Sequence, residues 1–399
     1  MNKDMTLEHQ ETDYKDKLPI GNLIALSVAS FLAIMTETIP AGLLPQISVG
    51  LSISEALAGQ FVTLFAIGSV VSAIPLVTLT RGWHRKKVLL MALCILFIAN
   101  TLTALSNDYV LTLILRFIAG MATGLLWGLV AGYARRMVKP SLQGRALAIA
   151  GTGQPIALSL GVPLGTWLAM YLEWQTIFLL ISVVTFCLII WITMKVPNYP
   201  GQPAEKQQSL YEIFKLPGIR PILCVVFVWI LAHNILYTYI APYMAHVELG
   251  DFVGVALFIF GISSMIGIWV IGLFIDHHLR LITLMSLGAF AASSLVLGIS
   301  SGIPWLIFLS IAIWGLTFGG APTLLQTAMA DAAGDNADVA QSIFVTIFNL
   351  SVAGGGVLGG LILNQSGAGS FSWVLLALSI IGFMFVYNGK LYAFKSRLN

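Results

Sequence analysis

The chain has 399 residues, of which 58% are hydrophobic and only 9% are charged, and its formal net charge is +3. Because soluble domains carry about 25% charged residues, this composition excludes a water-soluble globular protein. The three cysteines lie in apolar runs, without the spacing of a disulfide framework or a metal site. We therefore expect a membrane protein.

Apolar runs long enough to cross a bilayer follow one another along almost the whole chain, each needing roughly 20 residues. They predict twelve transmembrane helices, at 19–46, 56–79, 87–107, 109–135, 143–171, 175–196, 220–246, 253–275, 281–300, 304–330, 339–364 and 371–392. One long polar segment separates the sixth helix from the seventh. We predict an all-α membrane protein with a tail at 1–18, a six-helix bundle at 19–196, a linker at 197–219, a second six-helix bundle at 220–392 and a tail at 393–399.

Lysine and arginine are distributed unevenly among the predicted loops. All of them except Arg116 fall in the tails or in loops separated by an even number of helices, as Arg85, Arg135, Lys195 and Lys390 do. The positive-inside rule places such loops in the cytoplasm. Both termini are therefore predicted to be cytoplasmic, with no cleavable signal before the first helix.

Short motifs recur in corresponding helices of the two halves. Trp127-Gly128 is matched by Trp314-Gly315, Gly161 and Gly165 by Gly355 and Gly359, and Pro40 by Pro242. Together these matches predict a duplicated six-helix unit whose copies have parallel orientation, a repeat found in one large class of transporters.

Three motifs resemble those of a known family. The first helix has Thr36-Glu37-Thr38-Ile39-Pro40-Ala41-Gly42-Leu43-Leu44-Pro45, the fourth has Arg116 followed by Gly120, and the fifth has Gly161-Val162-Pro163-Leu164-Gly165-Thr166. In this order they resemble the major facilitator superfamily, and within it the bacterial sugar, arabinose and purine-nucleoside efflux branch of the twelve-helix drug:proton antiporters. The resemblance covers about 18–392. It implies two bundles that alternate access to a central site, with Pro40, Gly161, Pro163 and Gly165 in the moving parts.

The superfamily's cytoplasmic loop motif is present in two unequal copies. After the second helix the basic residues Arg85 and Lys86 remain, but the usual aspartate is missing. After the eighth helix the motif keeps Gly272, Asp276 and Arg280. The resemblance implies that these residues control the cytoplasmic gate, and that the second copy contributes more.

Glu37 and Arg116 are the two charges well inside the first predicted bundle. Counted from the outer ends of their helices, both lie roughly 10 Å deep at 1.5 Å per residue. A charge at this depth is costly and marks a functional site by default. Burial favours the neutral acid and a nearby arginine favours the carboxylate, so Glu37 is a candidate proton carrier with Arg116 as partner. The alternatives are a glutamate near the helix end that reaches water on the outer face, and a static ion pair that fixes two helices.

Polar and aromatic side chains in the middle of other helices are candidates for substrate binding. They are Asn100, Trp127, Gln154, His233, Asn234, Tyr237, Tyr239, Trp314, Gln326 and Asn349. On a helix His233 and Tyr237 share one face. For each of these residues, packing or hydrogen bonding between helices is an equal alternative. The set contains no acid, which favours an uncharged or zwitterionic substrate.

These observations predict a proton-coupled secondary active efflux transporter in a bacterial inner membrane. It would work as a monomer, with a small neutral or amphiphilic solute such as a drug, sugar or nucleoside, protons and the lipid bilayer as its partners. We expect no enzyme activity, cofactor, metal or nucleic-acid partner. The glycine runs lack the lysine of a phosphate-binding loop. A symporter or facilitator of the same fold, and a non-transporting membrane sensor, are the alternatives.

Overall fold

The computed structural model describes residues 18–80, 82–139, 142–201, 213–300, 302–334, 337–390 and 392–394. Nearly all of the predicted N-terminal tail, half of the predicted linker and most of the C-terminal tail lie outside these ranges. The described residues form helices and turns and contain no strand. Twelve helical stretches among them are long and apolar enough to cross a membrane. The prediction of an all-α membrane fold is therefore confirmed.

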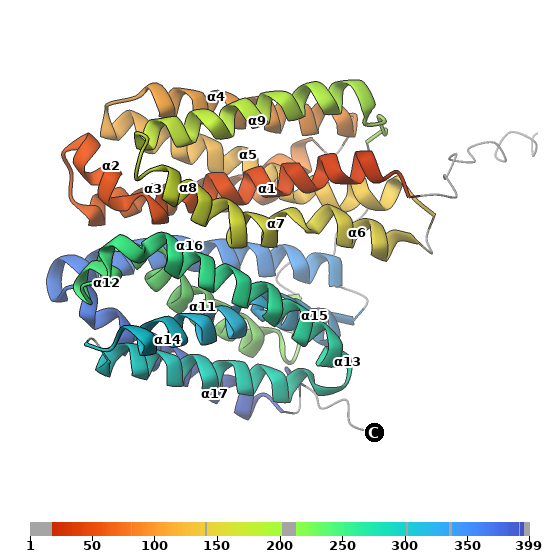
Figure 1. The fold of residues 1–399 in the computed structure, drawn as a ribbon. Helices are drawn as coiled ribbons and strands as arrows, with labels where there is room; N and C mark the ends of the chain where they lie inside the picture. The colour runs from red at the N-terminus through yellow and green to blue at the C-terminus, as the bar shows by residue number, and fades with distance from the viewer. Residues whose placement is uncertain are drawn as a thin grey trace, which may run out of the picture.

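The helices form two bundles that lie against each other (Figure 1). The first bundle contains α1 (Ile20–Gly42), α2 (Leu44–Leu51), α3 (Glu55–Leu79), α4 (Arg85–Leu105), α5 (Tyr109–Arg136), α6 (Gln143–Gly151), α7 (Gly153–Ile156), the π-helix η2 (Ala157–Gly161), α8 (Val162–Leu168) and α9 (Trp174–Lys195). The second contains α11 (Ile219–Thr238), α12 (Ile240–His246), the short η3 (Gly250–Phe252), α13 (Val253–Ile299), α14 (Pro304–Gly319), α15 (Ala321–Ala333), α16 (Ala337–Ser366), η5 (Ala368–Ser370) and α17 (Phe371–Asn388).

Several membrane-spanning stretches are interrupted. The first breaks at Leu43 between α1 and α2, and the seventh breaks at Tyr239 between α11 and α12. The fifth runs through α6, α7, η2 and α8, and the tenth through α14 and α15. Helix α13 holds two such stretches joined at a kink at His278.

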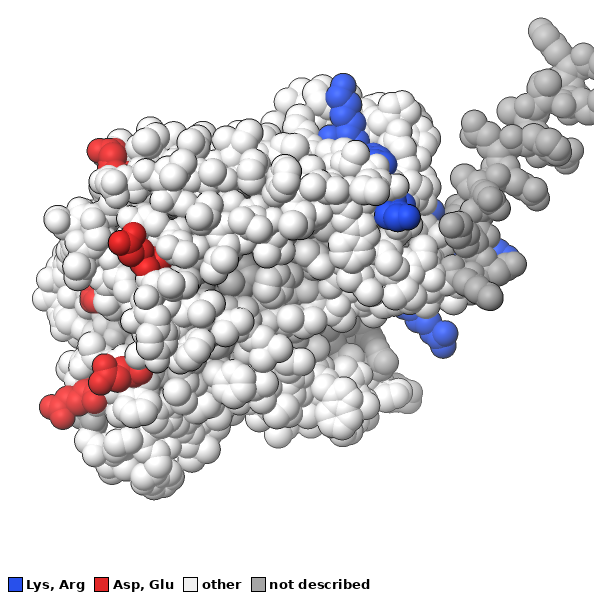
Figure 2. Space-filling view, turned by 45° about the horizontal axis from the view of Figure 1, so that its top comes forward, with Lys and Arg blue, Asp and Glu red and all other residues white. Residues whose placement is uncertain are grey.

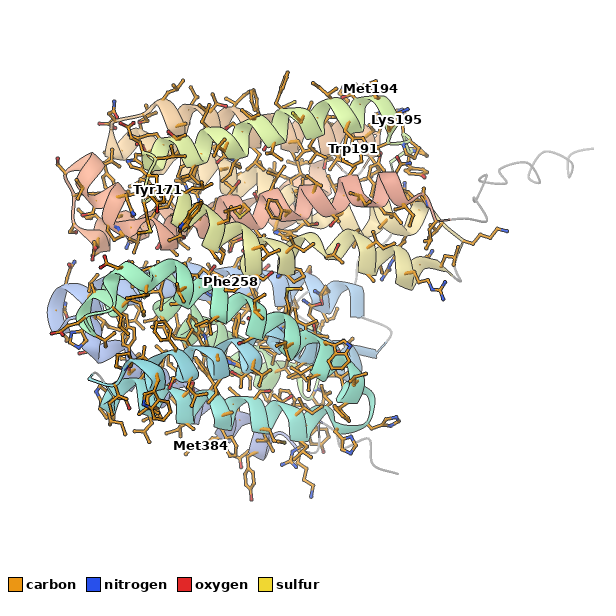
Figure 3. The ribbon with its side chains drawn as sticks, viewed as in Figure 1. Tyr171, Trp191, Met194, Lys195, Phe258 and Met384 are labelled. Atoms are coloured by element: carbon orange, nitrogen blue, oxygen red, sulfur yellow. The ribbon has the colours of Figure 1, made fainter. Side chains whose placement is uncertain are left out.

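The two ends of the molecule carry opposite charges. On the face drawn in Figure 2, Asp and Glu side chains gather at one end and Lys and Arg at the other. We call these the acidic end, which includes Glu55, Asp108 and Glu173, and the basic end, which includes Arg135 and Lys195. Between the ends, apolar side chains such as Met384 are exposed and point away from the bundles (Figure 3). An exposed apolar surface of this extent requires lipid around it.

Close packing inside each bundle depends on glycines at equivalent places. In the first bundle, a Cβ added at Gly120 or Gly124 of α5 would overlap the backbone of Phe65 or Ser69 of α3. In the second, Gly315 and Gly319 of α14 lie in the same way against Phe260 and Ser264 of α13. Each residue of the second set follows its counterpart by the same number of positions. Small residues at such contacts let membrane helices approach closely.

The constant offset between these glycine contacts supports a duplicated unit. It aligns the two halves differently from the short motifs matched in the sequence. Gly315 corresponds to Gly120, so Trp127-Gly128 and Trp314-Gly315 are not at equivalent positions. The helix breaks at Leu43 and Tyr239 do nearly correspond, whereas Pro40 precedes its break and Pro242 follows its break. In an apolar sequence, short identical motifs thus align the halves less reliably than close helix contacts do.

We predict that Gly120→Ala destabilises the protein by about 1–3 kcal/mol, because the added methyl group forces α3 and α5 apart. The measurement is thermal unfolding in detergent. Gly132→Ala is the matched control, since it lies on the same helix and its added Cβ would meet nothing within 4 Å. Equal unfolding temperatures for the two variants would contradict the packing assigned to Gly120.

Candidate functional site

The first feature of the site is a backbone carbonyl left free by a proline. Pro40 lies inside α1, two residues before that helix ends. Proline has no backbone N–H, so the carbonyl four residues earlier loses its helical hydrogen bond. That carbonyl belongs to Thr36, the residue before Glu37. An unpaired carbonyl at this depth is costly and needs another donor.

Arg116 supplies that donor from α5. Its side chain is fully buried, and its Nη2 donates to the Thr36 carbonyl oxygen at 2.5 Å. Its Nε donates to the carbonyl oxygen of Phe61 at 3.4 Å. The guanidinium also lies over the rings of Phe65 and Phe178, with its central carbon 4.8 Å and 5.5 Å from the two ring centres. Such contacts stabilise a buried cation.

The carboxyl of Glu37 lies near this arginine, but the two groups do not form an ion pair. The two charges are close enough to interact electrostatically. However, Nη1 of Arg116 is buried and has no hydrogen-bond partner. Glu37 itself is half-buried, so part of its surface remains accessible. The structure thus brings the two predicted residues together and leaves one buried N–H of the arginine free for the carboxylate.

Asn100 supports the same turn of α1. Its side chain is fully buried, and its Nδ2 donates to the hydroxyl of Thr36 at 3.0 Å. Thr36 is therefore held through its hydroxyl by α4 and through its carbonyl by α5. Asn100 was predicted to contact substrate; in the structure it is packed between helices and orients the residue that precedes Glu37.

A cluster of aromatic rings in the second bundle lies near Glu37. It contains His233 and Tyr237 of α11, Phe260 of α13, and Trp314 and Phe318 of α14. Trp314 Nε1 donates to Nδ1 of His233 at 3.2 Å. The buried hydroxyl of Tyr237 lies close to the side chain of Thr38 and within electrostatic reach of Glu37. The cluster and the Glu37 site therefore face each other across the junction of the bundles.

Tyr239 lies at the contact that closes the acidic end. Its side chain is fully buried, and its hydroxyl donates to the Gly356 carbonyl oxygen of α16 at 2.7 Å. Gln60 of α3 donates to the same carbonyl at 3.3 Å and to the Tyr239 hydroxyl at 3.4 Å. A Cβ at Gly59 or Gly359 would overlap the tyrosine ring. Tyr239, a predicted substrate residue, thus joins the two bundles where they are in contact.

Other contacts between the bundles also lie toward the acidic end. A Cβ at Gly261 of α13 would overlap Ser159 of η2, and Gly42 of α1 lies close to Leu257 of α13. Toward the basic end, added Cβ atoms at Gly132 and Gly151 would meet nothing within 4 Å. The bundles are therefore in contact with each other at the acidic end.

The remaining predicted substrate residues occupy varied surroundings. Asn234 and Asn349 are 8% exposed, and each donates its side-chain N–H to the backbone carbonyl one turn earlier, at 2.9 Å. Trp127 and Gln154 are half-buried, and Gln326 is exposed. Of the ten candidates, Tyr237 lies near Glu37, and His233 packs beside it one turn earlier on the same helix.

The predicted moving parts have the following contacts. Gly161 and Gly165 lie against Met35 and Ile39 of α1, where a Cβ would overlap the side chain. Pro163 is the second residue of α8, which directly follows the π-helix η2, and it lies near Gly254 of α13. The fifth span thus packs closely on the Glu37 helix and touches the second bundle at the acidic end.

The loop-motif residues contact their own bundle at the basic end. The Arg85 backbone N–H donates to the Tyr199 carbonyl at 2.8 Å, and Lys86 Nζ donates to the Thr193 carbonyl at 2.9 Å. Arg280 donates to the carbonyl of Tyr387 on α17 at 2.9 Å. A Cβ at Gly272 would meet nothing within 4 Å. The side chain of Asp276 lies outside what the structure describes.

Sequence reasoning missed Gln60, Phe61, Phe65 and Phe178. Gln60 could have been found, because it is a polar side chain one turn into an apolar helix. The aromatic residues that enclose Arg116 could not, because nothing in the sequence distinguishes them from the many other phenylalanines of the spans.

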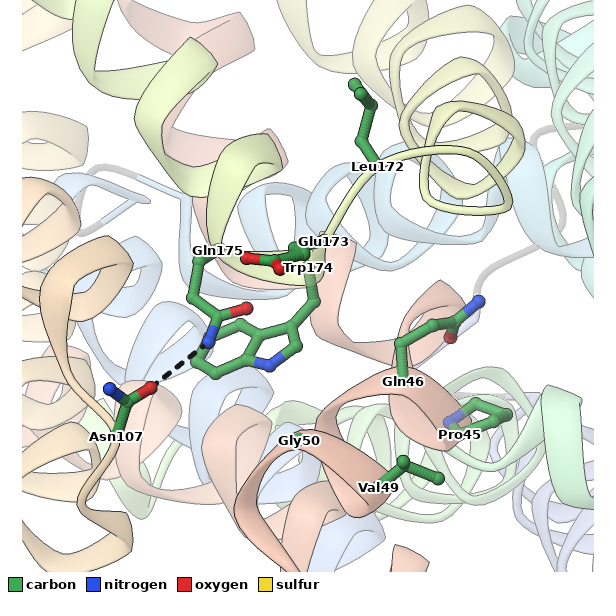
Figure 4. Close-up of a pocket in the computed structure, with 9 residues that line it drawn as sticks. All are labelled: Pro45, Gln46, Val49, Gly50, Asn107, Leu172, Glu173, Trp174 and Gln175. Carbon is green, nitrogen blue, oxygen red and sulfur yellow. Dashed lines mark hydrogen bonds between the residues drawn. The ribbon is translucent and has the colours of Figure 1, made fainter.

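A pocket of about 630 Å³ lies on the acidic end of the first bundle (Figure 4). Gln46, Trp174 and Gln175 are among the side chains that line it, and Gln175 donates to the Asn107 side chain at 3.4 Å. Neither Glu37 nor any residue of the second bundle lines it. This pocket is therefore separate from the junction described above.

The chain was then compared with known proteins. The family model described as "Major Facilitator Superfamily" matches residues 26–353. The chain is 24% identical to the "Probable sugar efflux transporter" of Helicobacter pylori (strain ATCC 700392 / 26695), over 92% of this chain and 94% of that protein. It is 29% identical to the "Purine ribonucleoside efflux pump NepI" of Escherichia coli (strain K12), over 84% of this chain and 85% of that protein. The predicted resemblance to an efflux branch is confirmed by these names. With a family model that spans most of its length and twelve apolar helices in two bundles, the chain belongs to the Major Facilitator Superfamily and is a membrane transporter rather than an enzyme.

Proposed function

We propose that this transporter exports a small neutral solute across the bacterial inner membrane in exchange for protons, and that Glu37 carries the proton. The observation that supports this most directly is the incomplete pairing of Glu37 with Arg116. Glu37 is half-buried as a residue, while Nη1 of the arginine is buried without a hydrogen-bond partner. A static ion pair would leave neither group in this condition.

Glu37 then has two arrangements that differ in charge. A protonated Glu37 is neutral and can face the junction at little cost. A deprotonated Glu37 is stabilised by the free Nη1 of Arg116, because a charge inside the membrane needs a partner. Solute and proton would favour different arrangements, so binding of one promotes release of the other.

The charge distribution supports an orientation in the membrane. The positive-inside rule assigns the basic end to the cytoplasm, with both termini inside. The bundles are in contact at the acidic end, which in this assignment faces outward. The export direction is supported by the names of two similar proteins, which describe efflux.

The substrate class follows from the side chains near Glu37. The His233 cluster and the hydroxyl of Tyr237 place aromatic and hydrogen-bonding side chains near Glu37 without a second acid. Two similar proteins bear names that refer to sugars and to purine ribonucleosides. Neutral polar solutes of these two kinds are therefore the substrates we propose, rather than cations.

The test is solute-driven proton movement in proteoliposomes that contain the purified transporter and an interior pH dye. We expect that adding one solute from a panel of pentoses, hexoses and ribonucleosides to one side of the membrane moves protons in the opposite direction. Liposomes without protein are the control. Solute flux that is unaffected by the pH gradient would instead support a facilitator of the same fold.

A further inference from the structure

His233 is held in place by aromatic rings on several sides. It lies parallel to Phe318, with 3.4 Å between ring centres and 5° between ring planes. The rings of Tyr237, Phe260 and Trp314 lie 5.2 Å, 5.6 Å and 5.4 Å away. This packing prevents the imidazole from turning over without moving its neighbours.

The hydrogen bond from Trp314 determines where the imidazole carries its proton. Indole Nε1–H can only donate. It donates to Nδ1 of His233 at 3.2 Å, so Nδ1 must present its lone pair. A charged imidazole would carry N–H groups on both nitrogens and would direct one of them at the indole N–H. Trp314 therefore favours the neutral ring with its proton on Nε2.

The Nε2–H group is then the free donor of the cluster. His233 takes part in one hydrogen bond among the described residues, and that bond uses Nδ1. The side chain is 7% exposed, and Nε2 is not among the polar atoms that are completely buried. Tyr237, one turn further on the same face, is next to Glu37. The free donor therefore belongs to the surface that the second bundle presents to the junction.

We infer that His233 is a permanently neutral, rotationally fixed donor that presents Nε2–H to a hydrogen-bond acceptor on the transported solute, and that Trp314 is the positioning residue that fixes it. This inference rests on the proposed function and adds a chemical requirement to it. The solute must carry an acceptor, such as a carbonyl oxygen or an unprotonated ring nitrogen, beside a face that can lie against aromatic rings. An ammonium group offers no acceptor and would meet an N–H.

The first experiment measures the protonation state of His233 without any solute. We expect the ¹⁵N NMR spectrum of histidine-labelled protein, assigned by comparison with His233→Gln, to show protonated Nε2 and unprotonated Nδ1 from about pH 5.5 to 8. The titratable neighbour on its own helix is Tyr237, and Glu37 of α1 lies beyond Tyr237; from α13 and α14 the groups in contact are Phe260, Trp314 and Phe318, which do not titrate. A proton on Nδ1, or titration of this ring within that range, would overturn the inference.

Trp314→Phe is the second variant in this experiment, because it keeps an aromatic ring and removes the indole N–H. We expect the His233 signals then to show a mixture of tautomers, or a charged ring at the acidic limit. An unchanged spectrum would mean that packing alone fixes the proton, and it would remove the positioning role from Trp314.

The second experiment tests recognition with inosine, a purine ribonucleoside whose base carries a carbonyl oxygen and unprotonated ring nitrogens. His233→Gln can place an amide N–H where Nε2 was, whereas His233→Asn reaches only the position of Nδ1 and keeps an acceptor for Trp314. We expect His233→Asn to raise the inosine concentration for half-maximal proton release by about fivefold to tenfold, the worth of one hydrogen bond, and His233→Gln to restore most of it.

The outcomes separate this inference from the proposed function. A His233→Asn variant with wild-type response to inosine, or a His233→Gln variant as weak as His233→Asn, would overturn the donor role while proton exchange stands. If the wild type exchanges sugars but not inosine for protons, the two His233 variants are tested in the same way with that sugar, whose hydroxyl oxygens are then the acceptors. Failure of every solute to move protons would contradict the proposed function itself, and the NMR result would still decide the state of His233.

Discussion

Glu37→Gln is expected to abolish proton-driven export while leaving solute binding intact. Glutamine has nearly the same shape as a protonated glutamic acid, but it can neither release nor bind a proton. The variant should therefore keep the conformations that neutral Glu37 allows, and lose the step in which the deprotonated carboxylate pairs with Arg116. In proteoliposomes with an imposed pH gradient, solute accumulation against its gradient should fall to the level of protein-free liposomes. Exchange of labelled for unlabelled solute without a gradient should persist.

The matched control is Glu173→Gln, which removes an acid of the first bundle from the exposed acidic end. It should transport like the wild type. If Glu37→Gln still accumulates solute at the wild-type rate, Glu37 is not the proton carrier. If the variant loses exchange as well as accumulation, Glu37 is not simply the proton carrier. It would then either contact the solute directly or have a static structural role.

The arrangement of spans could be predicted from the sequence because the bilayer imposes simple rules. Each span needs a long apolar run, and nearly all lysine and arginine residues lie in the loops and tails on one side. All twelve predicted spans coincide with apolar helical stretches of the structure to within a few residues at most of their ends. The breaks at Leu43 and Tyr239 and the π-helix at Ala157–Gly161 were not predicted, because they depend on how neighbouring helices pack.

The Glu37 site was predicted only in part. The sequence shows that Glu37 and Arg116 are the two charges at similar depth in one bundle, and it led to the expectation of a pair. The structure adds that Arg116 is mainly bonded to the backbone, at the carbonyl that Pro40 frees. The proline and the acid lie three positions apart in one motif. The bond between the Thr36 carbonyl and an arginine about 80 positions away can be seen only in the folded structure.

The substrate residues show the limit of reasoning from residue type alone. His233, Tyr239 and Trp314 are all aromatic or imidazole side chains in the middle of apolar spans, and the sequence ranks them equally. Only the packing distinguishes Tyr239, which joins the bundles at the acidic end, from His233, which keeps a free nitrogen. The two roles differ in which way the side chain points relative to the other bundle. A single sequence does not give that direction.

The bond between Arg116 and the Thr36 carbonyl predicts a strong coupling between Arg116 and Pro40. Arg116→Met should destabilise the protein by about 1–3 kcal/mol, because it leaves the buried carbonyl of Thr36 without a donor. In a Pro40→Ala background that cost should fall, since alanine restores the backbone N–H that bonds this carbonyl within the helix. Thermal unfolding of the wild type, the two single variants and the double variant gives the coupling free energy.

Arg116→Lys separates the backbone role of Arg116 from its charge. Lysine keeps a positive charge beside Glu37, but its ammonium group cannot bond both carbonyls and lie flat between Phe65 and Phe178. If charge alone matters, Arg116→Lys should transport like the wild type and Pro40→Ala should change nothing in either arginine variant. If the carbonyl bond matters, both Arg116→Met and Arg116→Lys should be unstable, and both should regain stability with Pro40→Ala. Only Arg116→Lys with Pro40→Ala should then also regain proton-driven transport, because it alone retains a cation for the carboxylate of Glu37.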